Sequence, residues 1–158
     1  MIVAEVMEPQ ASACSPNDSL RVAAQIMWER DCGSVPVTED GGRVVGMITD
    51  RDICMAAYLR DTRLGECAVG EVMARPAAAC RPSDPIGKAE STMREHRIRR
   101  LPVIDESNHL VGVLSLNDLV LATPRPVTGR QAHQQDDVLA TLATICEHRD
   151  RPSIEAAR

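Results

Sequence analysis

Aromatic side chains are nearly absent from this chain of 158 residues, which has no Phe, one Trp (Trp28) and one Tyr (Tyr58). Its core must therefore be built from Val, Ile, Leu, Met and Ala. The chain also lacks a basic excess, because its formal net charge is −5. An acidic chain with so few aromatics has neither a cationic stripe for phosphate backbones nor stacking platforms for bases. Nucleic-acid binding is excluded on these grounds.

Long apolar runs are lacking too, since none approaches the roughly 18 residues that a membrane span needs. The first residues, MIVAEVMEP, have no basic region ahead of an apolar one. We therefore expect a soluble, cytoplasmic protein without membrane contact. The six Cys residues include no C-x-x-C pair, so we expect reduced, buried thiols and no bound metal. Zinc binding by Cys146 with His148 or His133 is the alternative, although no standard ligand spacing supports it.

An internal repeat is what the chain does have. The segment VAEVM at 3–7 returns as VGEVM at 69–73, a shift of 66 positions. The same shift, without a gap, superimposes Asp52 on Asp118 and many aliphatic positions between. We therefore divide the chain into a first copy (1–66), a second copy (67–123) and a C-terminal extension (124–158).

Each copy has the same pattern of elements. A short extended segment (11–14) precedes a helix with apolar residues at helical spacing (20–27), then two strands around a turn (34–37 and 44–48), then a second helix (50–59). The second copy repeats this order at 77–122. A three-stranded sheet with two helices is too small to bury its own core comfortably. We expect an α+β (α/β) fold in which two copies, related by a pseudo-twofold axis, pack sheet to sheet.

The C-terminal extension begins as a polar, Pro-containing linker and continues with an amphipathic helix. The apolar residues at helical spacing are Val138, Leu139, Leu142, Ile145 and Cys146. We expect this face to pack on the chain's own module or on a second subunit. Docking on an unknown target is the alternative.

The motifs of the two copies resemble the cystathionine-β-synthase (CBS) domain family, in which two copies form a Bateman module. The likeness covers about residues 2–122. It is carried by EVM at 5–7 and 71–73, SPNDSL at 15–20, VPV at 35–37, LPV at 101–103, GMITDRD at 46–52 and GVLSLND at 112–118.

A hydroxyl and a carboxylate stand three residues apart at the start of each second helix, as Thr49 with Asp52 and as Ser115 with Asp118. One interpretation is a capping box, in which the two side chains satisfy backbone amides. The other is a ligand site, in which free amides and the hydroxyl favour phosphate while the carboxylate accepts from ribose hydroxyls. Spacing alone favours the capping box.

The family resemblance favours the second interpretation and implies further contacts. In CBS pairs the adenine lies between aliphatic side chains, beside the x-Pro of the first core strand. The corresponding residues here are Val35, Pro36, Ile48, Leu101, Pro102 and Leu114. Arg99 and Arg100 correspond to basic residues that approach phosphates, and Arg51 is a similar candidate; a solvated basic face is the alternative. Many family members carry Thr where this chain has Ala13 and Ala79, so one polar contact is lost.

The resemblance implies a regulatory module that binds AMP, ADP, ATP, NAD or S-adenosylmethionine, with no obligatory cofactor. We expect a homodimer that signals through an effector protein. No nucleophile–base pair can be assembled, so catalysis has no support. One alternative is a constitutive structural or stress-related dimer with empty ligand sites. Another is an enzyme or metal protein that uses the scattered Cys and His residues.

Overall fold

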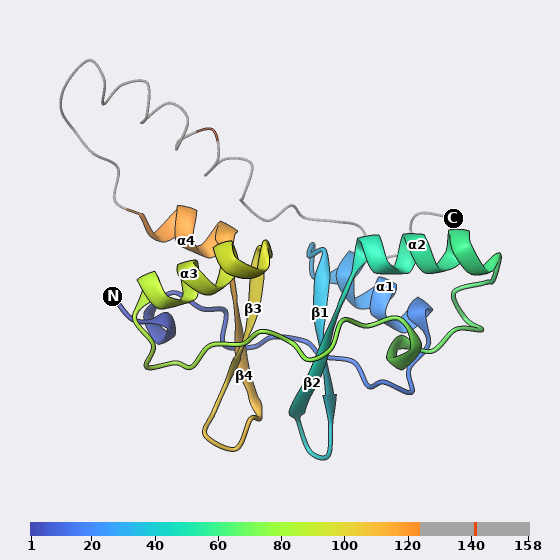
Figure 1. Ribbon diagram of the computed structural model, residues 1–158, viewed down its shortest axis with the longest axis horizontal. Coiled ribbons are helices and arrows are strands. Elements are labelled where there is room, and N and C mark those ends of the chain that lie inside the picture. Colours follow the sequence, from blue (N-terminus) through green and yellow to red (C-terminus); the bar gives the residue numbers. More distant parts are fainter. Residues whose placement is uncertain (124–140, 142–158) are drawn as a thin grey trace.

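The computed structural model describes residues 1–123 and Thr141 (Figure 1). The linker and amphipathic helix expected within 124–158 lie outside these described residues. Across the described part of the chain, no helix combines the length and apolar character that crossing a membrane requires.

The predicted α+β fold is confirmed, and both copies have the expected order of elements. In the first copy the elements are η1 (Val3–Glu5), α1 (Leu20–Glu29), β1 (Ser34–Glu39), β2 (Arg43–Thr49) and α2 (Asp50–Arg60). In the second copy they are η2 (Val69–Glu71), α3 (Ile86–His96), β3 (Arg100–Ile104), β4 (Leu110–Ser115) and α4 (Leu116–Ala122). Each copy contributes one antiparallel hairpin, β1–β2 and β3–β4.

The expected third strand of each sheet is reduced to a single parallel bridge. Cys14 bridges Val37 in the first copy, and Cys80 bridges Val103 in the second. Pairing ends there because the chain turns at once: the Asp18 amide donates to the Ser15 carbonyl (3.0 Å), and the Ser15 amide donates to Oδ2 of Asp18 (2.7 Å). The sheets are therefore two-stranded, and their further pairings are isolated bridges.

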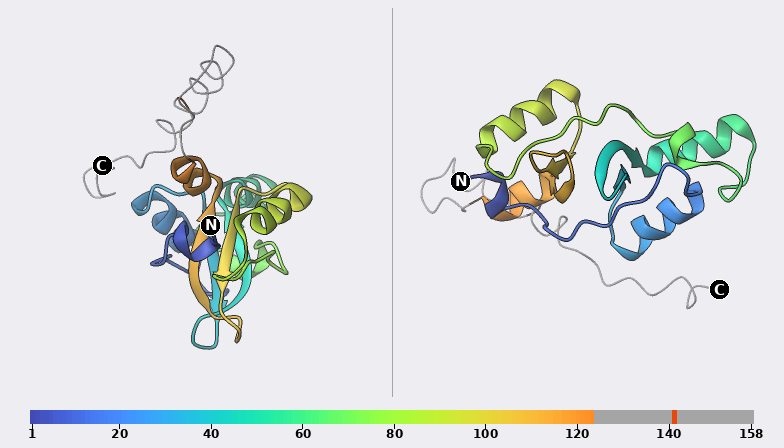
Figure 2. Two further views of the ribbon diagram at one scale, coloured as in Figure 1. Left: turned by 90° about the vertical axis from the view of Figure 1, so that its left-hand side faces the viewer. Right: turned by 90° about the horizontal axis from the view of Figure 1, so that it is seen from below.

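The two hairpins lie side by side at the centre of the molecule, and the helices cover their outer sides (Figure 2). At their tips the hairpins are joined by hydrogen bonds from the Val44 amide to the Asn108 carbonyl (3.0 Å) and from the Leu110 amide to the Gly42 carbonyl (2.9 Å). Each hairpin packs its own aliphatic core against its helices, around Leu20 and Ile48 in the first copy and around Leu101 and Leu114 in the second.

The five described cysteines are free thiols, and their environments differ. Cys14, Cys67 and Cys80 are buried, as expected, whereas Cys32 is half-buried and Cys54 is exposed on α2. Burial, together with Asp18 and Asp84 respectively, raises the pKa of the Cys14 and Cys80 thiols to about 11. These two thiols therefore act as small core hydrophobes, whereas Cys54 faces solvent.

The N-terminal segment of each copy docks on the other copy. Val3 belongs to the second core, where its amide donates to the Asp84 carbonyl (3.0 Å). Val69 belongs to the first core, where its amide donates to the Asp18 carbonyl (2.8 Å). The two spatial units thus exchange their first residues, and neither core is complete without the other copy.

Two equivalent glycines, Gly46 and Gly112, allow the exchanged segments to pack closely on the hairpins. The backbone of Glu8 pairs with Val113, and a Cβ on Gly112 would lie 2.6 Å from the Glu8 carbonyl oxygen. A Cβ on Gly46 would likewise lie 2.9 Å from the Ala74 carbonyl oxygen. These distances are shorter than real Cβ contacts, so a side chain at either position would push the exchanged segment away.

Gly112→Ala should therefore lower the free energy of unfolding by about 1–3 kcal/mol, the usual cost of overpacking. The matched control is Gly87→Ala on α3, where an added Cβ meets nothing within 4 Å. That change should raise stability by up to about 0.5–1 kcal/mol, because Ala is the better helix former. Urea denaturation measures both. A neutral Gly112→Ala would contradict the close approach of Glu8.

Candidate functional site

A cavity of about 540 Å³ lies between the two copies. One wall comes from the first copy, through β1, α1 and the segment that precedes them. The other wall comes from the second copy, through β4, α4 and the start of β3. Its lining residues are Glu8, Gln10, Ala11, Ser12, Ile26, Glu29, Arg30, Asp31, Cys32, Ser34, Pro36, Arg100, Val113, Ser115, Asn117, Asp118 and Leu121.

The β1 wall presents Ser34 and Pro36, which share one face of the strand because they are two residues apart. Ser34 is 8% exposed, and its Oγ is the one buried side-chain polar atom within the described residues that has no hydrogen-bond partner. A buried polar group without a partner costs about 1–3 kcal/mol and is uncommon in native proteins. Ser34 therefore lines the cavity, while its hydroxyl oxygen is buried and has no partner among the described residues.

On the opposite wall, Ser115 and Asp118 form a capping box at the start of α4. The Asp118 amide donates to Ser115 Oγ (3.2 Å), and the Ser115 amide and hydroxyl both donate to Oδ2 of Asp118 (2.7 Å each). The other carboxylate oxygen, Oδ1, has no hydrogen-bond partner within residues 1–123. Asp118 can thus cap the helix with one oxygen and accept from a ligand with the other.

Thr49 and Asp52 repeat this arrangement at the start of α2. The Asp52 amide donates to Thr49 Oγ1 (3.1 Å), while the Thr49 amide and hydroxyl donate to Oδ2 of Asp52 (3.0 and 2.7 Å). The capping interpretation is therefore confirmed for both pairs. It does not exclude ligand binding, because Oδ1 of Asp52 also has no hydrogen-bond partner in the described part of the chain.

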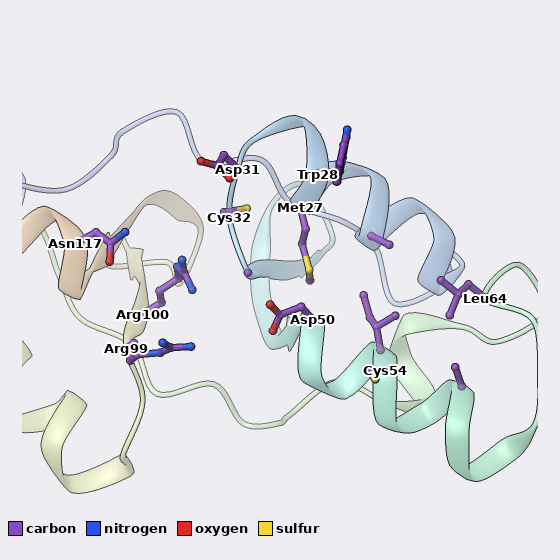
Figure 3. Close-up of a pocket in the computed structure, with 14 residues that line it drawn as sticks. Met27, Trp28, Asp31, Cys32, Asp50, Cys54, Leu64, Arg99, Arg100 and Asn117 are labelled. Atoms are coloured by element: carbon purple, nitrogen blue, oxygen red, sulfur yellow. The ribbon is translucent and has the colours of Figure 1, made fainter. Parts of the chain in front are cut away.

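The arginines predicted to approach phosphate lie at the junction of the copies. Arg100 is half-buried and lines the cavity described above as well as a second one of about 700 Å³, bounded by α1 and α2. Arg99 is exposed and lines the second cavity only. Figure 3 shows both side chains extending toward the side where Asp50 lies. Arg51 is exposed and lines neither of these two cavities, which fits a solvated position.

Five of the predicted site residues are fully buried, and four of them, all except Pro102, belong to the hydrophobic cores. Each has less than 2% of its surface exposed, and none of them lines either cavity: Val35, Ile48, Leu101, Pro102 and Leu114. Their side chains could reach a ligand only by leaving the core, although their backbone groups are not restricted in this way. Thr49 and Asp52 are half-buried and also line neither of the two cavities.

The cavity is lined by residues of both copies. Ser115 and Asp118 of the second copy face Pro36 of the first copy, instead of Leu101 and Pro102 of their own. The reason is the side-by-side packing of the hairpins, which places the end of β4 and the start of β1 on the same cavity. Sequence reasoning missed Ser34 and Asn117 as lining residues. The repeat offered a signal for Ser34, since the 66-residue shift superimposes it on Arg100.

The sequence profile of the CBS domain matches this chain twice, at residues 3–58 and 69–125. The chain belongs to the CBS-domain family. A relative, the CBS domain-containing protein YhcV of Bacillus subtilis, is 37% identical over 119 residues, which cover 75% of this chain and 83% of YhcV. Hypoxic response protein 1 of Mycobacterium tuberculosis is 30% identical over 120 residues, which cover 76% of this chain and 83% of that protein.

Solved structures of CBS proteins have the same fold. Hypoxic Response Protein I, solved with two coordinated zinc ions, has a TM-score of 0.72 and 29% identity, covering 78% of this chain and 100% of that one. CBSX2 in complex with AMP has a TM-score of 0.66 and 26% identity, covering 77% and 94%. In this CBS pair, no group of three or more His, Cys, Asp or Glu residues suited to a metal was found within the described residues.

Some relatives are much larger enzymes. Homoserine O-acetyltransferase of Methanococcoides burtonii is 32% identical over 117 residues, but this chain spans only 23% of its length. The likeness therefore concerns the CBS pair within that enzyme, and its activity does not follow for this chain.

The capping boxes predict that substitutions of Asp52 and Asp118 lower the stability of the fold even when no ligand is present. Asp52→Ala and Asp118→Ala should each lower the free energy of unfolding by about 1 kcal/mol without ligand, because each removes the carboxylate that accepts from the amide and hydroxyl of the cap residue. The control, Glu95→Ala on the exposed face of α3, should stay within about 0.5 kcal/mol of the wild type. Urea denaturation is the measurement, and unchanged stability of both Asp variants would argue against the capping geometry.

Proposed function

We propose that this CBS pair is a regulatory module that binds an adenosine nucleotide in the cavity between its two copies. The observation that carries the proposal is the meeting, in one cavity, of Asp118 with a spare carboxylate oxygen, the half-buried Arg100 and the apolar wall around Pro36. A carboxylate suits a ribose diol, an arginine suits phosphate, and an apolar wall suits a flat base. The AMP complex of CBSX2 supports the same class of ligand.

Thr49 and Asp52 are the second candidate site, because the pseudo-twofold repeat carries them onto Ser115 and Asp118. The two positions are not equivalent. Arg100 stands where the first copy has Ser34, so the cationic side chain of β3 has no counterpart on β1. We propose that the cavity at Asp118 is the principal site, with AMP, ADP, ATP, NAD and S-adenosylmethionine as candidates.

We further propose that the module is a homodimer, acts on a separate effector protein and catalyses no reaction. Exposed apolar side chains on the outer helices support an interface: Met55, Tyr58 and Leu59 on α2, and Leu116 and Leu121 on α4. Ligand binding would favour one arrangement of the two copies and so change the surface presented to the effector. The alternative is a constitutive structural or stress-related dimer with empty sites; the name of the M. tuberculosis relative, Hypoxic response protein 1, supports only the link to stress.

The first test is binding of AMP to the purified protein, by calorimetry and by thermal shift. AMP should raise the melting temperature by mass action. Asp118→Ala should weaken AMP binding by about ten- to a hundredfold, the range for losing hydrogen bonds to a charged group. Glu95→Ala should bind as the wild type does. If no adenosine nucleotide binds the wild type, the constitutive dimer becomes the better account of this protein.

The second test concerns the phosphate. Arg100→Ala should raise the Kd of AMP about tenfold or more and leave the Kd of adenosine unchanged, because adenosine has no phosphate for the guanidinium to bind. Arg94→Ala, an exposed arginine on α3, is the matched control and should alter neither value. Equal losses for AMP and adenosine would assign Arg100 to another part of the ligand or to the fold.

A further inference from the structure

The side chains of Asp50 and Arg100 meet at Gly33, at the junction of the two copies. Asp50 is the first residue of α2, and its Oδ1 accepts a hydrogen bond from the Arg51 amide (2.7 Å). Its other oxygen, Oδ2, lies 2.9 Å from the point where a Cβ of Gly33 would stand. Nη1 of Arg100 reaches to 3.6 Å from the same point. Figure 3 shows the carboxylate pointing toward the side from which Arg100 extends, so opposite charges share the space that the glycine leaves open.

The charges at this junction are divided unequally between the copies. Under the 66-residue shift, the second copy has Leu116 in place of Asp50. The first copy has Ser34 in place of Arg100. The pseudo-twofold repeat therefore gives this acid–base contact once and not twice. Because Arg100 also lines the cavity proposed for the nucleotide, the same guanidinium has the carboxylate of Asp50 on one side and the proposed phosphate position on the other.

We propose that Asp50 is a specificity-determining residue that competes with the phosphate of the bound nucleotide for Arg100. This inference rests on the proposed function. A ligand with a phosphate draws the guanidinium away from the carboxylate, whereas a ligand without one leaves the contact in place. Asp31 and Asp118 also line the cavity next to Arg100, but Asp50 is the carboxylate that meets it at Gly33. Asp50 thus weakens the binding of phosphate-bearing ligands and makes the site discriminate between adenosine compounds by their charge.

The experiment is a double-mutant cycle on the full chain, with AMP and adenosine binding measured by calorimetry. Asp50→Asn keeps the shape of the side chain and the acceptor for the Arg51 amide, and removes the charge. It should lower the Kd of AMP roughly two- to fivefold, the range for an exposed ion pair, and leave the Kd of adenosine unchanged. In an Arg100→Ala background the same change should not alter the Kd of AMP. Glu95→Gln on exposed α3 is the control and should bind both ligands as the wild type does.

The melting temperature without nucleotide tests the contact independently of binding. The losses of Asp50→Asn and Arg100→Ala should exceed, when added, the loss of the double variant. Additive losses would overturn the contact. An unchanged or raised Kd of AMP in Asp50→Asn would overturn the competition, and so would a gain in affinity that persists without Arg100, since it would come from direct repulsion between Asp50 and the phosphate. A wild type that binds no adenosine nucleotide would overturn the proposed function, whereas non-additive melting temperatures would still establish the contact.

Discussion

The exchange of N-terminal segments between the copies is the constraint on which the rest of the structure depends. The Glu8 carbonyl reaches the β4 backbone only because Gly112 has no side chain, and the Ala74 carbonyl reaches β2 only because of Gly46. Backbone hydrogen bonds then fix each segment on the opposite hairpin. Since two small sheets with few aromatics bury little surface on their own, this exchange is what makes two weak units one domain.

The same exchange shapes the cavity that we propose as the ligand site. Glu8 and Gln10 of the crossing segment line the cavity between the copies, together with Ser34 of β1 and Asp118 of α4. A site made from both copies responds to their relative arrangement. A ligand that contacts both walls binds one arrangement better than another, and this difference in affinity is what a regulatory module needs.

The sequence was sufficient to predict the repeat, the order of elements, the fold and both hydroxyl–carboxylate pairs, because these depend on local spacing. It was insufficient to predict that Ser115 and Asp118 face Pro36, because that depends on how the hairpins pack. The buried positions of Ile48 and Leu114 follow from the same cause: on a two-stranded hairpin covered by helices, alternate residues enter the core. The third strand was overestimated because Asp18 turns the chain just after Cys14.

The capping boxes and the ligand site are not competing explanations of the same residues. Oδ2 of Asp118 is held by the amide and hydroxyl of Ser115, which fixes the carboxylate before any ligand arrives. Oδ1 is then held in one orientation before it accepts a hydrogen bond from the proposed ligand, so binding does not have to order this side chain. An Asn in place of Asp118 could also be held by Ser115, but it would lack the charge that strengthens hydrogen bonds from a sugar diol. The carboxylate of Asp118 therefore serves both the start of α4 and the ligand that we propose.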